Sequence, residues 1–196
     1  MPFQNRVTPL GELISTPERG LLYGNRGRLH DEHGNIRRQW QVKRWISCRL
    51  EFRGRHRAGG PMMPNRYTGL FFLDEATALA AGHRPCAECR NPDYRSFLEL
   101  TSASRAGELD ELLHAERGHP HESELDDLPD GAFVVLEGEP WLVLGSELLR
   151  WTPGGYSEQR PRFSGRISVA TPPTSLRVLA SSWRGTLPLV HPSRPS

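Results

Sequence analysis

Apolar and polar residues alternate along the stretch from Ile36 to Arg53. An alternation of period two predicts a strand with one buried face, because successive side chains of a strand point to opposite sides. Arg38 and Arg44 interrupt the apolar face, so we expect one long strand or two strands joined at a bulge. The expected buried face consists of Ile36, Trp40, Val42, Ile46, Cys48, Leu50 and Phe52.

A helical period begins after Asp74, which is a good N-cap residue. Apolar residues recur at helical spacing from Ala76 to Ala80. Gly82 suits the position just after a helix, and Pro85 cannot continue one. The pattern therefore predicts a short helix followed by a tight turn.

Shorter patterns predict the remaining elements. Residues 1–17 are polar and interrupted by prolines, and we expect them to lie against the surface. Further on, the patterns predict helices from Asn91, around residues 109–113 and from Thr174 to Ser182, a connection at 118–130, strands at 132–136, 141–144, 148–151 and 167–170, and a loop at 152–166.

These elements predict an α+β chain in three segments. Residues 1–105 form a small strand-rich module with helices, and residues 106–130 form a helical and acidic connection. Residues 131–196 form a small β-meander with a C-terminal helix, which we expect to pack on the first module.

Composition limits the cellular setting. The chain has 196 residues, and no run of 18 apolar residues predicts a membrane-spanning helix. The first ten residues lack the apolar region of a signal peptide. Three cysteines, two of them spaced as C-x-x-C, fit a reducing compartment better than a disulfide framework. We therefore expect a cytoplasmic protein with no membrane partner.

The C-x-x-C pair, Cys86 and Cys89, is the strongest candidate for chemistry. Two thiolates at this spacing can bind one Zn²⁺, and they can also form a redox pair. A redox pair usually follows a strand and opens a helix, whereas here a predicted helix precedes the pair, which favours metal. Cys48 is the third candidate ligand, and its alternative is a thiol packed in the core.

The stretch that ends at this pair resembles the zinc module of Ada-type DNA repair proteins. That module has a strand ending in phenylalanine, a short alanine-rich helix and then a G-[aromatic]-R-P-C-x-x-C sequence. The resemblance covers about 20 of the 196 residues, and the matching ones are Phe72, Glu75, Ala76, Ala78, Gly82, Arg84, Pro85, Cys86, Cys89 and Arg90.

The resemblance implies that the first module binds zinc and that two further ligands lie upstream. In the Ada-type pattern these form a C-x-x-x-C sequence, which this chain lacks; upstream it offers Cys48 and three histidines. We expect Cys48 and His30 to complete the site, with His33 as the competitor of His30. His83 is interpreted as a packing residue. A set of three cysteines and one histidine leaves no open position, so the zinc would be structural.

Charge is distributed unevenly. Residues 1–70 hold 13 Lys or Arg against 5 Asp or Glu, and residues 71–196 hold 12 against 18, so a basic half precedes an acidic one. Arginines interleaved with aromatic residues are typical of nucleic-acid binding, and DNA is the expected partner. The candidate phosphate contacts are Arg26, Arg28, Arg37, Arg38, Arg44, Arg55, Arg57, Arg84 and Arg90.

Three other interpretations stay open. The chain can be an enzyme acting on nucleic acid, either a thiolate alkyl acceptor or a nuclease that uses His114, Glu116, His119 and His121. It can be a protein-interaction module. The basic half can also dock on the acidic segment around residues 122–130. Neither a phosphate-binding P-loop nor a dinucleotide-binding or serine-hydrolase motif occurs in the chain.

Overall fold

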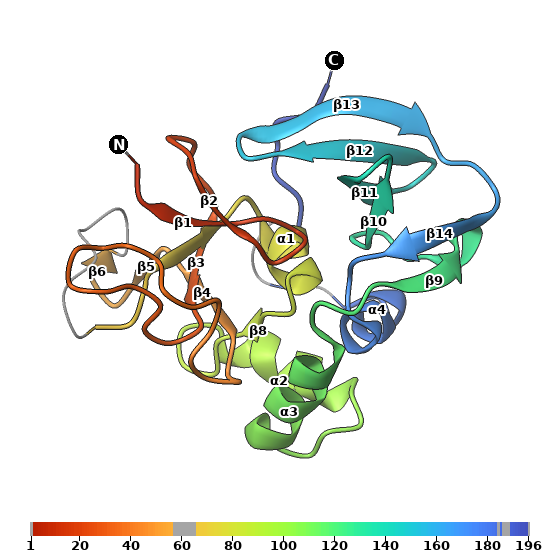
Figure 1. The fold of residues 1–196 in the computed structure, drawn as a ribbon. Helices are drawn as coiled ribbons and strands as arrows, with labels where there is room; N and C mark the ends of the chain where they lie inside the picture. The colour runs from red at the N-terminus through yellow and green to blue at the C-terminus, as the bar shows by residue number, and fades with distance from the viewer. Residues whose placement is uncertain (1, 57–65, 184, 186–188, 196) are drawn as a thin grey trace.

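The computed structural model describes residues 2–56, 66–183, 185 and 189–195, with Arg55 and His56 described by their backbone alone. Two six-stranded sheets stand side by side, and the helices lie between and below them (Figure 1). Strands and four helices in the described residues confirm the α+β class.

The first sheet is mixed and has the order β2-β1-β7-β3-β4-β8. Its pairs β1/β7 and β4/β8 are parallel, and the other neighbours are antiparallel. A short hairpin of β5 (Glu51–Phe52) and β6 (Arg55–His56) follows β4. The strands of the sheet are β1 (Gln4–Val7), β2 (Leu13–Ser15), β3 (Leu22–Asn25), β4 (Ile46–Arg49), β7 (Leu70–Phe72) and β8 (Arg84–Pro85).

The second sheet is antiparallel throughout and has the order β13-β12-β11-β10-β14-β9. Its first four strands form a meander, and a 3-10 turn at Leu125–Asp127 follows β9. The strands are β9 (His121–Glu124), β10 (Phe133–Leu136), β11 (Glu139–Leu144), β12 (Glu147–Thr152), β13 (Gly155–Pro161) and β14 (Arg166–Val169).

Helix α1 (Glu75–Ala80) lies at the centre of the molecule, and all six of its residues are buried. One face of α1, with Ala76 and Ala80, packs on residues of the second sheet such as Phe133 and Trp151. Its Leu79 packs in a helical core with α2 (Asn91–Glu99), α3 (Ala106–Glu116) and α4 (Pro173–Ala180). The proposed division at residues 105 and 130 stays a prediction, since α1 contacts both sheets.

The expected extent of the strand pattern, from Ile36 to Arg53, is wrong: two consecutive strands form, β4 and β5, but they cover only residues 46–52. The backbone of residues 37–42 bonds to the preceding turn instead: Arg37 N donates to Leu29 O, and Gln41 N donates to Arg26 O. Trp40 is 43% exposed, so the alternation in this part did not mark a buried face.

Strands β9 and β13 form where a connection at 118–130 and a loop at 152–166 were expected, and β1 and β2 form within residues 1–17. Three of these four strands, β2, β9 and β13, lie at sheet edges. Edge strands tolerate many polar residues, because one side of the strand faces solvent. This explains why their sequences carry little apolar signal.

In the described part of the chain, none of the helices is long and apolar enough to cross a membrane.

Candidate metal centre

The turn that carries Cys86 and Cys89 is positioned by parallel pairing between β4 and β8. Ile46 pairs with Arg84 and Ser47 pairs with Pro85. The residue that follows on each side is a cysteine, Cys48 in β4 and Cys86 directly after β8. Cys86 N donates to Ser47 O at 2.9 Å and continues the pairing. The register therefore places two thiols from distant segments side by side.

Cys89 is brought back to Cys86 by a tight turn. Arg90 N donates to Cys86 O at 3.0 Å, and α2 begins immediately afterwards at Asn91. Before the turn, Gly82 ends the α1 segment with a φ of +76°, a conformation that favours glycine. The predicted sequence of helix, turn and helix is therefore present, with both sulfurs on the turn.

The three thiols form a compact group. The sulfur atoms of Cys48, Cys86 and Cys89 all lie within 4.8 Å of one another. Sulfurs at about 2.3 Å from a tetrahedral zinc ion are about 3.8 Å apart, so this spacing fits one shared ion. Within the described ranges, this is the one group of three or more His, Cys, Asp or Glu side chains close enough to hold a metal.

The three thiols differ in acidity, and the pKa of one of them, Cys86, is lowered. Hydrogen bonds from Cys48 and Cys89, together with backbone N–H groups, lower the pKa of the Cys86 thiol. One of these, from Glu88 N, measures 3.4 Å. Hydrogen bonding to its two neighbours, followed by burial, raises the pKa of Cys48. Cys86 is therefore the first thiolate, and a bound cation would favour deprotonation of the other two.

Apolar side chains enclose the sulfurs. Tyr23 is buried with the three cysteines, and Ile46, Leu50, Phe52 and Phe71 pack against the group. Each cysteine is at most 6% exposed. Such an enclosed site is typical of structural metal sites, which do not need a position open to substrate.

The buried guanidinium groups of Arg90 and Arg84 form ion pairs next to the turn that carries Cys86 and Cys89. Arg90 is fully buried and donates to Asp93, Glu75 and the Ser47 hydroxyl. Arg84 donates to both carboxylate oxygens of Asp110, at 2.8 and 3.0 Å. The prediction that Arg84 and Arg90 contact phosphates is corrected by these ion pairs, because both guanidinium groups are enclosed.

Arg26 is also buried, so it is not part of an exposed basic surface. Its Nε donates to His83 Nε2 at 3.2 Å. His83 is itself fully buried against the rings of Phe72 and Trp45, in agreement with its interpretation as a packing residue. Burial, followed by the charges of Arg26 and Arg117, holds the pKa of His83 well below its usual value, so the ring is neutral.

His30 lies outside the cysteine group. Its Nδ1 is 2.6 Å from the hydroxyl oxygen of Thr68, and the ring is buried. His33 is exposed and close to Glu32, with 3.6 Å between Nε2 and the carboxylate. Three of the four predicted ligands are therefore brought together, and His30 is not among them.

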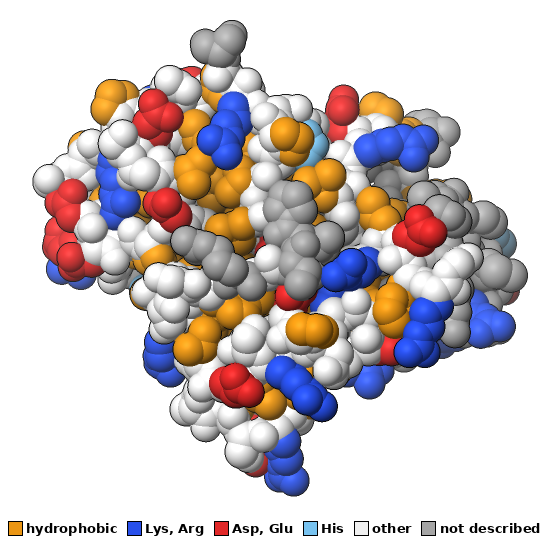
Figure 2. Space-filling model, turned by 180° about the vertical axis from the view of Figure 1, so that it is seen from behind, with side chains coloured by type: hydrophobic (Ala, Val, Ile, Leu, Met, Phe, Trp, Pro, Cys, Tyr) orange, Lys and Arg blue, Asp and Glu red, His pale blue; other side chains and the backbone are white. Residues whose placement is uncertain are grey.

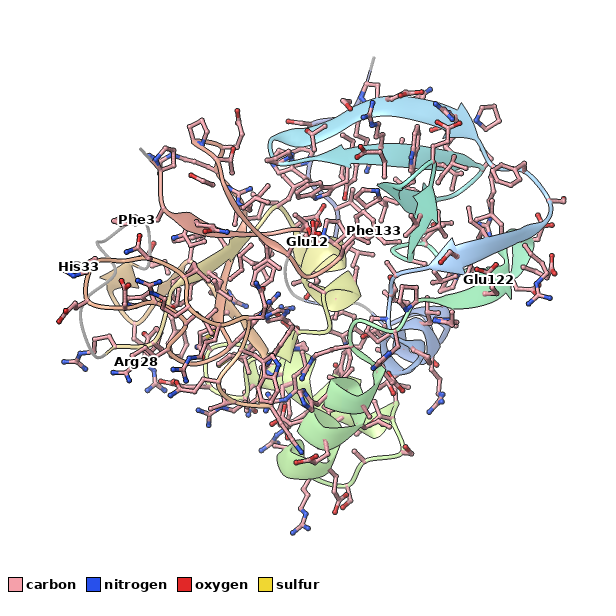
Figure 3. The ribbon with its side chains drawn as sticks, viewed as in Figure 1. Phe3, Glu12, Arg28, His33, Glu122 and Phe133 are labelled. Atoms are coloured by element: carbon pink, nitrogen blue, oxygen red, sulfur yellow. The ribbon has the colours of Figure 1, made fainter. Side chains whose placement is uncertain are left out.

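Four of the predicted phosphate-binding arginines are exposed on the segment from residue 28 to 44 that precedes β4: Arg28, Arg37, Arg38 and Arg44. Figure 3 shows Arg28 and His33 on the outer side of the first sheet, far from Glu122 on the second. Arg37 donates to Asp31 at 2.7 Å, which is one reason why the pKa of Asp31 is lowered, after the bond from Asn35 N. The side chain of Arg55 and the whole of Arg57 lie outside the described residues.

His114 and Glu116 in α3 and His119 and His121 after it form no metal group within the described chain. Glu116 instead accepts from Thr174 N and Oγ1, at 2.9 and 2.8 Å, and so binds the start of α4. His114 packs edge-on against Trp40, with ring centroids 4.6 Å apart.

No protein-family model matches the chain, and no curated protein and no solved structure was found to match it.

Proposed function

We propose that this protein binds one zinc ion through Cys48, Cys86 and Cys89 and that the ion has a structural role. The observation that carries the proposal is the convergence of three buried sulfur atoms from two segments that are 38 residues apart at their closest. A bound zinc would connect β4 to the turn before α2. The basic segment that precedes β4 would thereby be anchored to the helices.

Three features favour a metal site over a redox pair. A disulfide uses two thiols, whereas three converge here. The sulfurs are covered by apolar side chains, whereas redox and alkyl-acceptor thiols must be reached by a substrate. All three thiols are free, and the set of sulfur donors suits the borderline-soft Zn²⁺ ion. The likeness of the turn to the Ada-type module points in the same direction.

His30 and His33 are the two candidates for the fourth ligand. His30 would have to give up its hydrogen bond with Thr68 to act as a ligand. Single His30→Ala and His33→Ala variants separate the two candidates by metal content.

We also propose that the exposed arginines of residues 28–44 contact the phosphates of nucleic acid. The observation in favour is their position on one exposed segment together with Trp40. Arginine supplies charge-assisted hydrogen bonds to phosphate, and an exposed aromatic ring can stack on a base.

The zinc site is tested by metal content. We expect about one zinc per chain in freshly purified protein and loss of the metal in Cys48→Ser, measured by elemental analysis. Ala87→Ser is the matched control, because Ala87 is exposed on the same turn and offers no ligand. Wild-type protein without metal, or Cys48→Ser with unchanged zinc, would exclude the three-cysteine site.

Nucleic-acid binding is tested across a salt series. Replacement of Arg37, Arg38 and Arg44 together by Gln should weaken DNA binding. It should also reduce the slope of log affinity against log salt by up to about 3, because counterions are no longer released at the phosphates whose contacts are lost. The control replaces the exposed Arg95, Arg166 and Arg177, which lie on other surfaces. If both triple variants bind equally, the basic segment is not the binding surface.

A further inference from the structure

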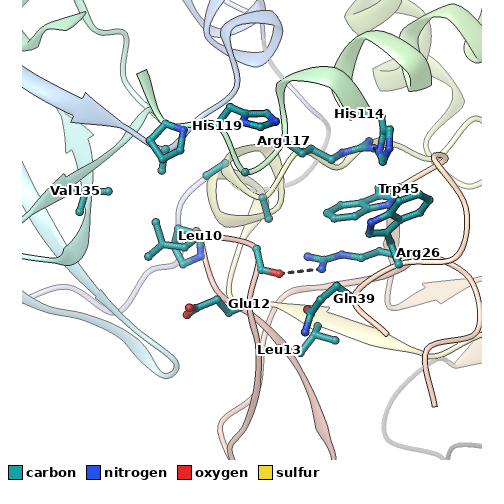
Figure 4. Close-up of a pocket in the computed structure, with 18 of the residues that line it drawn as sticks. Leu10, Glu12, Leu13, Arg26, Gln39, Trp45, His114, Arg117, His119 and Val135 are labelled. Atoms are coloured by element: carbon teal, nitrogen blue, oxygen red, sulfur yellow. Dashed lines mark hydrogen bonds between the residues drawn. The ribbon is translucent and has the colours of Figure 1, made fainter. Parts of the chain in front are cut away.

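A cavity of about 950 Å³ lies between the first sheet and the second sheet. Its walls come from the turn between β1 and β2, the segment 39–45, the end of α3 and strands β10 and β14. Figure 4 shows two arginines, Arg26 and Arg117, reaching into it above and below the indole of Trp45. The cavity is separate from the cysteine group, and none of its lining residues is a candidate ligand of the zinc.

Arg26 has more hydrogen-bond donors than the protein uses. The side chain is fully buried; Nε donates to His83, and Nη1 donates to Gly11 O at 2.9 Å. Its buried Nη2 has no hydrogen-bond partner. A buried guanidinium nitrogen without an acceptor is costly, so an acceptor is expected from a ligand.

Arg117 repeats this arrangement from the other side of the cavity. Its Nε donates to Gly82 O and its Nη1 to Lys43 O, each at 2.9 Å, which fixes the side chain on backbone carbonyls. Its Nη2 is also buried without a partner. The guanidinium carbons of Arg26 and Arg117 lie 3.9 and 4.3 Å from the ring of Trp45, so one indole orients both groups.

No direct ion pair within the described residues balances the two positive charges. No described carboxylate forms a salt bridge with Arg26 or Arg117. Burial and the charge of Arg117 lower the pKa of Arg26 to about 9. Burial also lowers the pKa of Arg117 to about 9, although Asp110, which is itself bound by Arg84, and Glu116 oppose this shift. Among the lining residues, Arg26 and Arg117 carry positive charge and Glu12 carries the one negative charge, so the cavity has an excess of positive charge.

Apolar and aromatic side chains line other parts of the cavity. Leu10, Leu13 and Val135 line one part of it, and the exposed indole of Trp40 lines another beside His114. The volume falls within the roughly 300–1,000 Å³ that small-molecule sites occupy.

We propose that this cavity binds a phosphomonoester attached to an aromatic base, with the phosphate at the edge of the Trp45 indole, where its oxygens accept from Nη2 of Arg26 and Nη2 of Arg117, and the base near Trp40. A phosphomonoester carries a charge of about −1.5 to −2 at pH 7, which matches two arginines better than the single charge of a carboxylate. Its three terminal oxygens can accept from two guanidinium groups that approach from different elements. The same chemistry is present in a free 5′-mononucleotide and in the 5′-phosphate end of a nucleic acid.

Calorimetric titration of the full chain tests the proposal with defined probes: inorganic phosphate, a 5′-mononucleotide, the corresponding nucleoside, and an oligonucleotide with and without a 5′-phosphate. We expect the mononucleotide to bind more tightly than phosphate and much more tightly than the nucleoside. Tighter binding of the phosphorylated oligonucleotide than of the same oligonucleotide without its 5′-phosphate assigns the cavity to nucleic-acid ends. Equal binding of the two oligonucleotides, together with binding of the mononucleotide, assigns it to free nucleotides. Equal binding of nucleoside and mononucleotide, or binding of benzoate in place of phosphate, overturns the proposal.

Two variants assign binding to this cavity. Arg117→Met should weaken mononucleotide binding by about tenfold or more, because a charge-assisted hydrogen bond is lost. The exposed Arg95→Met is the control and should bind as the wild type does. Since Arg117 also holds two backbone carbonyls, Trp40→Ala is measured as well. Trp40 is exposed, so this variant should fold, lose about fivefold or more in mononucleotide affinity and retain phosphate binding. Unchanged mononucleotide affinity in Trp40→Ala contradicts the proposed position of the base.

Discussion

The buried positive charge of Arg84 is compensated by one carboxylate, that of Asp110. Its side chain is 2% exposed, and it forms a two-point ion pair with Asp110, whose side chain is 10% exposed. Charges removed from water in this way contribute little net stability as a pair, but removal of one partner leaves the other uncompensated.

Arg84→Met should therefore reduce the free energy of unfolding by about 3–5 kcal/mol, measured by urea denaturation of metal-loaded protein. The double variant Arg84→Met with Asp110→Leu should recover much of this loss, because neither charge of the pair remains. Arg95→Met, at an exposed site, should change stability by no more than about 0.5 kcal/mol. A double variant no more stable than the single one would show that Asp110 is not the partner that matters.

At the scale of single residues, the sequence predicted the positions of the cysteines well, but it did not predict which arginines are buried. The C-x-x-C motif identified Cys86 and Cys89, and the parity of the strand pattern placed Cys48 on a buried face. Buried Arg84 and exposed Arg44 look alike in the sequence. Their difference comes from partners such as Asp110, which are brought near only by the fold.

Helix α1 is the element that connects the two sheets, and Asp74 fixes its N-terminus. One oxygen of Asp74 accepts from Thr77 N at 2.8 Å, and the other accepts from Tyr156 Oη at 2.6 Å and His191 N at 2.9 Å. Burial raises the pKa of Asp74, and these hydrogen bonds oppose the shift. One side chain thus caps α1 and binds it to β13 and to the C-terminal segment.

Asp74→Ala should destabilise the protein by about 2–4 kcal/mol, because it removes a helix cap and leaves the buried Tyr156 hydroxyl without its acceptor. The exposed Asp126→Ala is the control. A thermodynamic cycle with Tyr156→Phe measures the coupling between the helix and β13. Additive losses in the cycle would mean that the 2.6 Å hydrogen bond does not connect the two elements energetically.

The elements that the sequence predicted best carry a strong periodic signal or clear end signals. Helix α1 was predicted from its cap and its glycine, and β10, β11 and β12 were predicted from continuous apolar runs. Strands β9 and β13 were missed because they are polar edge strands. The parallel pairing of β4 with β8, which builds the candidate metal site, joins segments nearly 40 residues apart and leaves no local signal.

At the scale of the whole molecule, the cores of the two sheets meet on α1, and the charges divide between them. Seen from behind, acidic side chains gather at the left edge, over the second sheet, among apolar and basic ones (Figure 2). Among the buried charges, Arg90 lies between Glu75 and Asp93 and forms an ion pair with each. The guanidinium group of Arg90 thus balances the charge of two carboxylates.

Glu75 should make stability depend on pH. Burial raises its pKa from 4.5 to about 7, although the charge of Arg90 opposes the shift. The folded state therefore binds more protons than the unfolded state between these values, and the free energy of unfolding falls as pH rises through that range. The slope is at most about 1.4 kcal/mol per pH unit.

Glu75→Gln should remove this slope, which is measured as urea midpoints of both proteins between pH 4.5 and 8. Deprotonation of the metal-binding thiols acts in the opposite direction, but it is common to both proteins and cancels in the difference. Parallel pH profiles of wild type and variant would show that Glu75 does not titrate in this range.

The most direct test of the central claim is X-ray absorption at the zinc edge of the purified protein. The proposed site predicts three sulfur ligands at about 2.3 Å and one nitrogen or oxygen ligand at about 2.0–2.1 Å. A zinc shell with no sulfur, or with only two sulfurs, would contradict a site formed by Cys48, Cys86 and Cys89.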